Sequence, residues 1–389
     1  MIEFFSQTAV RKFFMSMALL LFLTGCQSYT ETYGGQERKA TSPTKKEIKA
    51  GMTATLSRAD TDMQAVLTAL QDLAPKPIES LSAEEARKQP TPADAVMILL
   101  RKRSLIVQPE IVGLVENRTI PGPDGANIPV RVYTPLGKGP FPMIVYFHGG
   151  GWVFATLDTY DSSARALTNA AGAVVLSVEY RKGPEHRFPA AHEDAFAAYH
   201  WAQQHGAEIH GDPARVAVAG ESAGGNLAAA VPIMARERRV PLPVHQLLIY
   251  PVTSQDLNSP SYRENADAIP LNRAMMPWFF EKYLNTPQEA EHPWISVVNA
   301  RSLKELPPAT ILTADIDPLR SDGTRYADRL REAGVPVLYM NYEGVTHEFF
   351  GMGAVVLQAK RAVETAGTEL RHGFETGAPA VGVPANDSK

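Results

Sequence analysis

Short apolar runs alternate with helical segments along most of the chain, and this alternation restricts the fold more than any other feature. Eight such runs follow residue 110, covering residues 111–116, 128–133, 143–147, 173–178, 215–219, 246–250, 309–314 and 337–341. Several are continuously apolar, which is typical of parallel strands covered by helices on both faces. The first two alternate between apolar and polar residues, so we expect antiparallel strands at the sheet edge. The pattern predicts an α/β fold with a mostly parallel eight-stranded sheet flanked by helices.

A candidate nucleophile follows the run 215–219. The sequence Gly-Glu-Ser-Ala-Gly-Gly at residues 220–225 stands between this predicted strand and a helix of small residues. A G-x-S-x-G motif needs this strand-to-helix context, because the sharp turn leaves no room for side chains beside the serine. Such a turn presents Ser222 near a helix N-terminus, where developing negative charge is favoured. The alternative is a glycine-rich turn with an incidental serine.

A second glycine-rich turn, His-Gly-Gly-Gly-Trp at residues 148–152, follows the run 143–147. Glycines leave amide N–H groups free to point at a substrate oxygen. Two such donors and the amide of Ala223 would hold the oxyanion of a tetrahedral intermediate. A merely flexible glycine loop is the alternative, but the position upstream of the serine motif favours the oxyanion hole.

These motifs resemble those of the hormone-sensitive-lipase-like α/β-hydrolases, the bacterial family IV esterases, over the chain from about residue 60 onward. The matching stretches are residues 148–152, 180–191, 220–225, 317–319 and 344–349. The resemblance implies a triad in the order Ser, Asp, His, with Gly150 and Gly151 as oxyanion donors beside Ala223. It also implies the α/β-hydrolase fold with a helical cap, built from N-terminal helices and an insertion.

Three residues depart from the family pattern. Glu221 stands before the serine where the family usually has aspartate. Ala155 and Glu348 stand where small residues or glycine often occur, and Glu348 directly follows the candidate histidine. We expect Glu348 to narrow the space beside that histidine.

The other two members of the triad follow the last two predicted strands. Of ten histidines, His347 lies in the loop after the run 337–341, whereas most others fall on predicted helices or exposed loops. The acid should follow the run 309–314, which leaves Asp315, Asp317 and Asp322. Asp322 lies at a helix start and is expected to cap it. Asp317 matches the acid of the family, and Asp315 remains the alternative.

The first 26 residues differ from the rest of the chain in their pattern of charged and apolar residues. Arg11 and Lys12 precede an apolar stretch at 13–23, which is typical of a secretory signal and too short to span a bilayer. Leu-Thr-Gly before Cys26 resembles the lipobox of bacterial lipoproteins, so Cys26 is expected to be lipidated and to become the mature N-terminus. The alternative is a free cysteine in an ordinary signal peptide. Gln27 favours a lipid-anchored protein of the cell envelope, at the outer membrane.

The chain is expected to divide at composition changes. Residues 1–25 are predicted to be the signal peptide with its lipobox, 26–56 a flexible tether, 57–110 N-terminal cap helices, 111–375 the catalytic domain and 376–389 a disordered tail. A cap insertion is predicted at about 253–299. Its apolar residues Met275, Trp278 and Phe279, with Trp152 beside the oxyanion glycines, are expected to line the substrate pocket.

Together these features predict a serine carboxylic-ester hydrolase that acts on short- to medium-chain acyl esters through an acyl-serine, without a cofactor or metal. A net charge of −4 gives no basic surface for nucleic acid. The expected partners are a small ester and, through Cys26, a membrane; a homodimer stays open. The triad would also serve amides, lactones or acylated glycans, and a catalytically silent binding protein on this fold is a further alternative.

Overall fold

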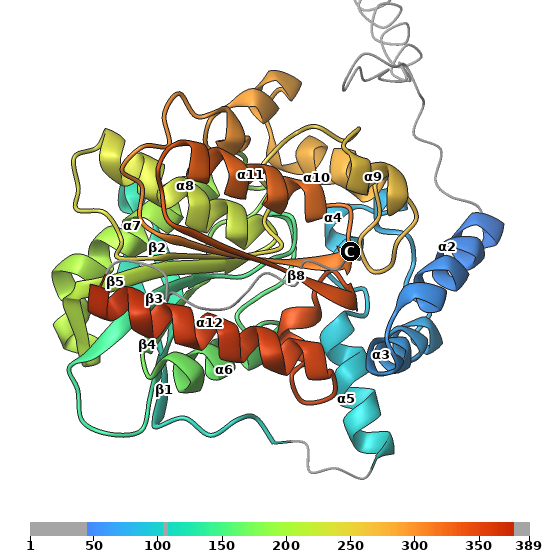
Figure 1. The fold of residues 1–389 in the computed structure, drawn as a ribbon, viewed down its shortest axis with the longest axis horizontal. Coiled ribbons are helices and arrows are strands. Elements are labelled where there is room, and N and C mark those ends of the chain that lie inside the picture. Colours follow the sequence, from blue (N-terminus) through green and yellow to red (C-terminus); the bar gives the residue numbers. More distant parts are fainter. Residues whose placement is uncertain (1–44, 104–107, 377–389) are drawn as a thin grey trace, which may run out of the picture. The chain divides into compact units, whose positions relative to one another are not determined.

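A mixed sheet of eight strands forms the centre of the computed structural model, which describes residues 45–103 and 108–376. The order across the sheet is β1-β2-β4-β3-β5-β6-β7-β8 (Figure 1). The strands are β1 (Leu114–Pro121), β2 (Asn127–Thr134), β3 (Phe141–Phe147), β4 (Val174–Val178), β5 (Gly211–Glu221), β6 (Gln246–Ile249), β7 (Ala309–Ile316) and β8 (Val337–Thr346). The pairs β1–β2 and β2–β4 are antiparallel and the remaining pairs are parallel, which confirms the predicted fold class.

The first two strands differ from expectation in place and extent. β2 is not an edge strand, since it lies between β1 and β4. β1 begins at Leu114 and not at residue 111, because its partner strand ends at Thr134 and the register pairs these two residues. Pro135 follows and cannot donate a backbone hydrogen bond to a ladder. Ile111 is therefore left 76% exposed.

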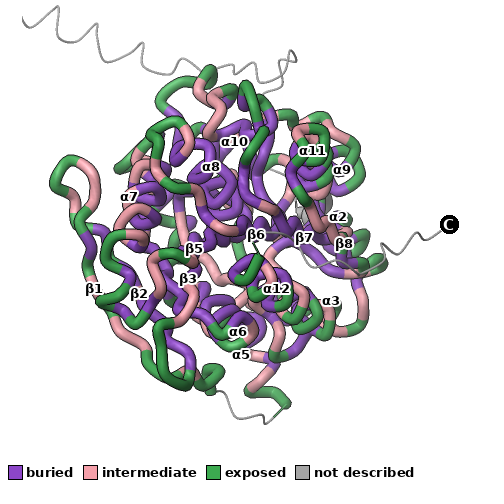
Figure 2. The backbone as a smooth tube through the Cα atoms, turned by 60° about the vertical axis from the view of Figure 1, so that its left-hand side comes forward, coloured by how far each residue is buried: buried purple, intermediate pink, exposed green. Residues whose placement is uncertain are grey.

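Helices cover both faces of the sheet. Figure 1 shows α6 (Asp161–Ala171) and α12 (Leu357–Thr376) on one face, and α7 (Ala190–His205), α8 (Ala223–Glu237) and α11 (Arg320–Glu332) on the other. The segments of β3, β5 and β6 between these layers are buried (Figure 2). Burial on both faces explains why these strands are continuously apolar and do not alternate. Three short 3₁₀ turns lie in the connections between these strands and helices: η2 (Pro123–Gly125), η3 (Gly206–Ile209) and η6 (Phe349–Met352).

The N-terminal helices begin earlier than the sequence suggests. Residues 45–56 were expected to belong to a tether, but α2 (Lys45–Arg58) is a helix. Met52 and Thr55 on it are buried, and Gly51 lies so close to the Asp267 backbone that a Cβ would overlap it. Packing against residues more than 200 positions away therefore stabilises a helix whose own residues give a weak pattern.

The next helices agree more closely with the periodicity. They are α3 (Thr61–Asp72), η1 (Ile78–Ser80), α4 (Ala83–Ala86) and α5 (Pro92–Lys102). Thr91 and Asp94 form a capping box at the start of α5. Within the described ranges no helix is both long and apolar enough to cross a membrane. The signal peptide, Cys26 and residues 377–389 lie outside the described residues.

The insertion between β6 and β7 meets the N-terminal helices. It contains α9 (Pro260–Glu264), α10 (Met275–Tyr283), η4 (Pro287–Glu291) and η5 (Val297–Asn299). The indole Nε1 of Trp278 on α10 donates to the carbonyl of Leu81, 2.9 Å away, just after η1. Two segments far apart in sequence thus form one layer over the catalytic motifs.

Candidate active site

Ser222 occupies a strained turn between β5 and α8. Its backbone has φ 57° and ψ −118°, a conformation that costs energy for a residue with a Cβ atom. A Cβ at Gly220 would overlap the Gly224 carbonyl, and one at Gly224 would overlap the carbonyls of Phe147 and His148. Only glycine therefore fits at these two positions, and the turn holds the Ser222 side chain above the end of the sheet.

His347 follows β8 and joins the serine to an acid. Its Nε2 lies 2.9 Å from Ser222 Oγ, and its Nδ1 lies 2.7 Å from Asp317 Oδ2. Burial lowers the pKa of His347, but the negative charge of Asp317 raises it, with smaller contributions from Glu348 and Glu221. The net result is a raised pKa. The structure thus brings the three predicted residues Ser222, His347 and Asp317 into one hydrogen-bonded chain.

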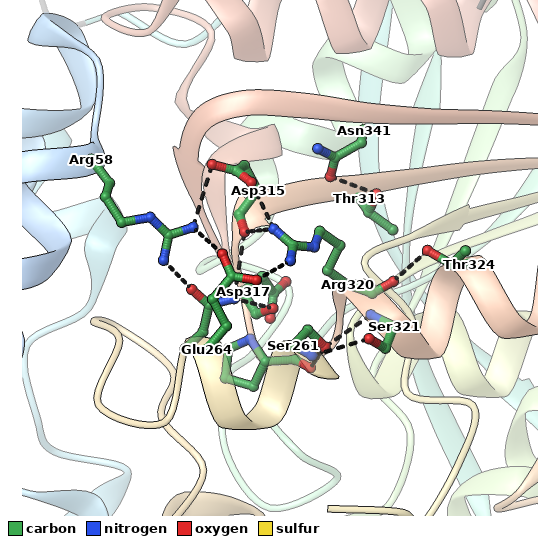
Figure 3. Close-up of polar contacts among 12 residues, drawn as sticks. Arg58, Ser261, Glu264, Thr313, Asp315, Asp317, Arg320, Ser321, Thr324 and Asn341 are labelled. Atoms are coloured by element: carbon green, nitrogen blue, oxygen red, sulfur yellow. Dashed lines mark hydrogen bonds and ion pairs between the residues drawn. The ribbon is translucent and has the colours of Figure 1, made fainter. Parts of the chain in front are cut away.

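The two alternative acids have other partners. Asp315 forms ion pairs with Arg320 at 2.7 Å and with Arg58 at 3.5 Å (Figure 3). Asp322 does not cap its helix as expected. Its carboxylate instead accepts the backbone N–H groups of Thr253 and Ser254, each at 2.9 Å, and so ties the start of the insertion to α11.

The loop that carries Asp317 is also held by α2. Arg58 donates to the side-chain oxygen of Asn265 at 2.7 Å, and the Asn265 amide donates to the carbonyl of Asp317 at 3.1 Å. Arg58 also pairs with Glu264 at 2.9 Å (Figure 3). The helix missed in the sequence therefore supports the acid loop through Arg58 and one intermediate residue, Asn265.

The glycine turn after β3 lies beside the serine. Gly150 and Gly151 have φ values of +94° and +59°, and a Cβ would overlap the Phe154 carbonyl at the first and the Phe279 ring at the second. In the part of the chain that the structure describes, no protein acceptor takes the amide N–H of Gly150, Gly151 or Ala223. These donors remain available to a ligand, as an oxyanion hole requires.

His148 shapes this turn from below. It is fully buried, its ring stacks on Tyr180 at 4.3 Å, and its Nδ1 lies 2.8 Å from the Gly149 carbonyl. The Tyr180 hydroxyl donates to the carbonyls of His148 and Gly149. Burial lowers the pKa of His148 to about 4, so the ring stays neutral. Its role is to hold the conformation of the glycine turn.

Comparison with known proteins agrees with this geometry. The sequence profile of a family described as alpha/beta hydrolase fold matches residues 144–351. The chain is 43% identical over 280 residues to carboxylesterase NlhH of Mycobacterium tuberculosis, covering 70% of this chain and 88% of the relative. The chain belongs to the α/β-hydrolase family.

Two further similarities come from Pseudomonas putida. An ethyl acetate hydrolase from this organism is 33% identical over 287 residues, which cover 73% of this chain and 88% of the relative. A thermostable esterase of strain ECU1011, whose structure is solved, is 36% identical with a TM-score of 0.74, over 82% of this chain and 98% of that one. The match therefore spans nearly the whole length of these α/β-hydrolases.

A cavity of about 810 Å³ opens over Ser222 and His347. Gly150 and Gly151 line it together with Met275 and Phe279, as expected from the sequence. Apolar residues that the sequence did not single out complete the wall: Leu70, Ile78, Ile269 and Leu271. They come from α3, η1 and the insertion, so the cavity exists only where these segments meet.

Two tryptophans expected in the pocket do not line it. Trp152 has φ +60° and is fully buried, with its ring stacked on Tyr283 at 5.1 Å. Trp278 packs its ring edge to face against Phe279 at 5.3 Å. Met275 and Phe279 are four residues apart on α10 and share a helix face, whereas the indole of Trp278 is held by its hydrogen bond to the Leu81 carbonyl. Trp278 therefore packs against the wall residue Phe279, and Trp152 is a core residue.

Glu221 is buried under the serine turn with partners that the sequence does not reveal. Its carboxylate accepts the hydroxyl of Tyr146 at 2.5 Å and that of Tyr250. Burial raises the pKa of Glu221 to about 7, against the two tyrosine hydrogen bonds that lower it. The extra methylene relative to aspartate is thus accommodated by two hydroxyl donors from β3 and the end of β6.

The pKa of Glu221 predicts a dependence of stability on pH. The folded state holds its proton more tightly than the unfolded state, so this stabilisation is complete below pH 4.5 and is lost as pH rises through about 7. Over this window the loss amounts to about 3 kcal/mol. Glu221→Gln should therefore show a flatter dependence of the free energy of unfolding on pH, measured by urea denaturation at several pH values.

The control for this prediction is Glu343→Gln, which removes an exposed carboxylate on β8. Its curve should run parallel to that of the unaltered protein. Parallel curves for Glu221→Gln would contradict the raised pKa.

Proposed function

We propose that this α/β-hydrolase cleaves carboxylic esters through an acyl intermediate on Ser222, with His347 as the base and Asp317 as the acid that orients it. The observation that carries the proposal is the continuous chain from Ser222 Oγ through His347 to Asp317, with links of 2.9 and 2.7 Å. Ester hydrolysis itself follows from the family and its named members: the chain is a carboxylesterase.

The reaction begins when His347 Nε2 accepts the proton of Ser222 as Oγ attacks the ester carbonyl. The amides of Gly150, Gly151 and Ala223 stabilise the oxyanion that forms, and each such donor is typically worth about 3 kcal/mol of barrier. His347 then protonates the leaving alcohol. Asp317 accepts a hydrogen bond from Nδ1, which keeps Nε2 free to accept the proton of Ser222. Water releases the acid from the acyl-serine by the same path.

The apolar wall of the cavity supports short- and medium-chain acyl groups as substrates. Each methylene that enters the cavity contributes up to about 0.8 kcal/mol. Once the wall formed by Leu271, Met275 and Phe279 is reached, further methylenes must clash or stay in water. Selectivity for acyl length is thus a consequence of the roof that the insertion and the N-terminal helices make.

We predict that kcat/KM peaks between acetyl and hexanoyl esters and falls steeply by dodecanoyl. The test is a series of p-nitrophenyl esters of increasing acyl length, assayed with the purified chain from residue 45. Amide, lactone and acylated-glycan panels run beside it, with Ser222→Ala as the blank. A maximum at long-chain triglycerides with activation at a lipid interface would contradict the roofed cavity, and higher values on amides would reassign the substrate class.

We further propose that the enzyme is a lipoprotein, anchored through Cys26 in the bacterial envelope at the outer membrane. The basic pair, the apolar stretch and Leu-Thr-Gly before the single cysteine support this. Two or more acyl chains would anchor it stably.

Mass spectrometry of the membrane fraction should find a diacylated or triacylated Cys26 as the N-terminus. Cys26→Ser should leave the protein unprocessed or unanchored, with unchanged esterase activity in detergent extracts. Another N-terminus, or an unmodified cysteine in the membrane-bound protein, would exclude the anchor.

A further inference from the structure

Glu348 places a carboxylate inside the cavity beside the reacting nitrogen of His347. It directly follows the histidine and has φ +70°, a left-handed conformation that favours glycine and is strained for glutamate. Its side chain lines the cavity together with Ser222 and His347. A strained residue whose polar group points into the site suggests a functional role more than a packing one.

The carboxylate of Glu348 is held in one orientation. The hydroxyl of Tyr160 donates to both of its oxygens, at 2.7 and 2.6 Å. Oε1 lies 3.9 Å from His347 Nε2, which is the nitrogen that faces Ser222. Tyr160 is itself fixed, since it is almost fully buried at the start of α6 and its hydroxyl abuts Gly149.

One water molecule can contact both groups from the side. A water about 2.8 Å from each atom fits their separation of 3.9 Å when the angle at its oxygen is about 90°. When Oγ of Ser222 is esterified it no longer donates to Nε2, and a water can take its place as the donor. The second O–H of that water then meets the Glu348 carboxylate.

We propose that Glu348 holds the water that hydrolyses the acyl-serine and thereby favours water over alcohols as the acyl acceptor. This inference rests on the proposed function of Ser222 and His347. Water has two O–H donors and can donate to both Nε2 and Glu348, whereas an alcohol has one and places its alkyl group against the carboxylate instead of a second donor. The carboxylate keeps the hydrogen bond from Tyr160, but an apolar group against a buried charged acceptor is costly, so the alcohol is disfavoured.

Deacylation begins with attack by this water on the acyl-serine. The water oxygen forms a bond with the acyl carbon while one water proton passes to Nε2, and the carbonyl electrons move to the oxyanion. The intermediate collapses, the bond from carbon to Ser222 Oγ breaks, and Nε2 returns its proton to Oγ. The second water proton remains on the released carboxylic acid, where it is hydrogen-bonded to Glu348 until the product leaves.

The experiment measures how the acyl-enzyme divides between water and an added alcohol. Wild type and variants are mixed with p-nitrophenyl butyrate and methanol at about pH 8, because alkaline pH favours the ionised form of Glu348, whose pKa is raised by burial. Butyric acid and methyl butyrate are quantified, and the p-nitrophenol burst is followed separately. The product ratio reports on deacylation whichever step limits turnover.

Glu348→Gly suits the backbone at φ +70° and should keep or raise the melting temperature. We expect its ratio of methyl butyrate to butyric acid to rise about tenfold, the effect of losing one charge-assisted hydrogen bond to the attacking water. Its burst rate should change little. Glu348→Gln should give a smaller rise, and Tyr160→Phe, which frees the carboxylate but keeps its charge, an intermediate one.

Glu343→Gln is the matched control, since it removes an equal charge from an exposed position on β8 and should leave the ratio unchanged. An unchanged ratio in both Glu348 variants would overturn the inference, as would an equal fall of burst and steady-state rates, which indicates a structural or purely electrostatic role. A burst that survives in Ser222→Ala would instead refute the proposed function.

Discussion

Ser222→Ala should lower ester hydrolysis by at least about 10⁴-fold while the folded structure persists, because no other group can form the acyl intermediate. Alanine keeps the Cβ and loses only Oγ, whose partner in the structure is His347 Nε2 at 2.9 Å. The backbone at φ 57° is as strained for alanine as for serine. The measurement is kcat/KM on p-nitrophenyl butyrate, together with the melting temperature.

Ser57→Ala removes an exposed hydroxyl on α2 and serves as the matched control, with unchanged activity. Covalent labelling with an organophosphate gives a second readout. The label should be found on Ser222 and should be absent from the alanine variant. Hydrolysis above one-hundredth of the wild-type value in a sample verified by mass would refute Ser222 as the nucleophile.

Asp317→Asn should lower kcat by about 10³- to 10⁴-fold, whereas Asp315→Asn should cost less than about tenfold. The side-chain amide that replaces the Asp317 carboxylate would donate to Nδ1 of His347 and so place the ring proton on Nε2. Nε2 could then no longer accept the proton of Ser222. Asp315 instead pairs with Arg320 and Arg58, partly exposed ion pairs whose loss costs little.

The two aspartates are matched controls for each other, since Asp315 is at the end of β7, Asp317 directly follows the strand, and both variants lose the same charge. The melting temperatures of both variants show whether a loss of activity comes from unfolding or from the wrong tautomer of His347. Equal losses of kcat, or a larger loss for Asp315→Asn, would refute Asp317 as the acid of the triad.

Local sequence chemistry was sufficient for the sheet and for the serine turn. The runs in β3 to β7 are apolar because helices bury both faces, so the strand cores can be located without knowing their partners. The turn at Ser222 is equally local, since Gly220 and Gly224 are required by atoms within the turn and by the adjacent strand. The triad aspartate and histidine were found from their place after strands and from motif resemblance.

Partners distant in sequence decided the rest. α2 is a helix because it packs against the insertion, and Arg58 on it supports Asn265 and the Asp317 carbonyl. Burial of Trp152 and the position of Trp278 behind Phe279 depend on how α10 rotates against its neighbours. A hydrophobic period cannot distinguish a residue that lines a cavity from one that packs behind it.

The triad could be predicted from local motifs, but the environment of the two glutamates could not. The sequence by itself identified Glu221 and Glu348 as unusual, because it shows which residue types occupy a motif. Only the tertiary structure decided their partners, Tyr146 and Tyr250 for the first and Tyr160 for the second. Whether a carboxylate is buried and which donors reach it depends on contacts between strands and helices far apart in the chain, and no local pattern encodes those contacts.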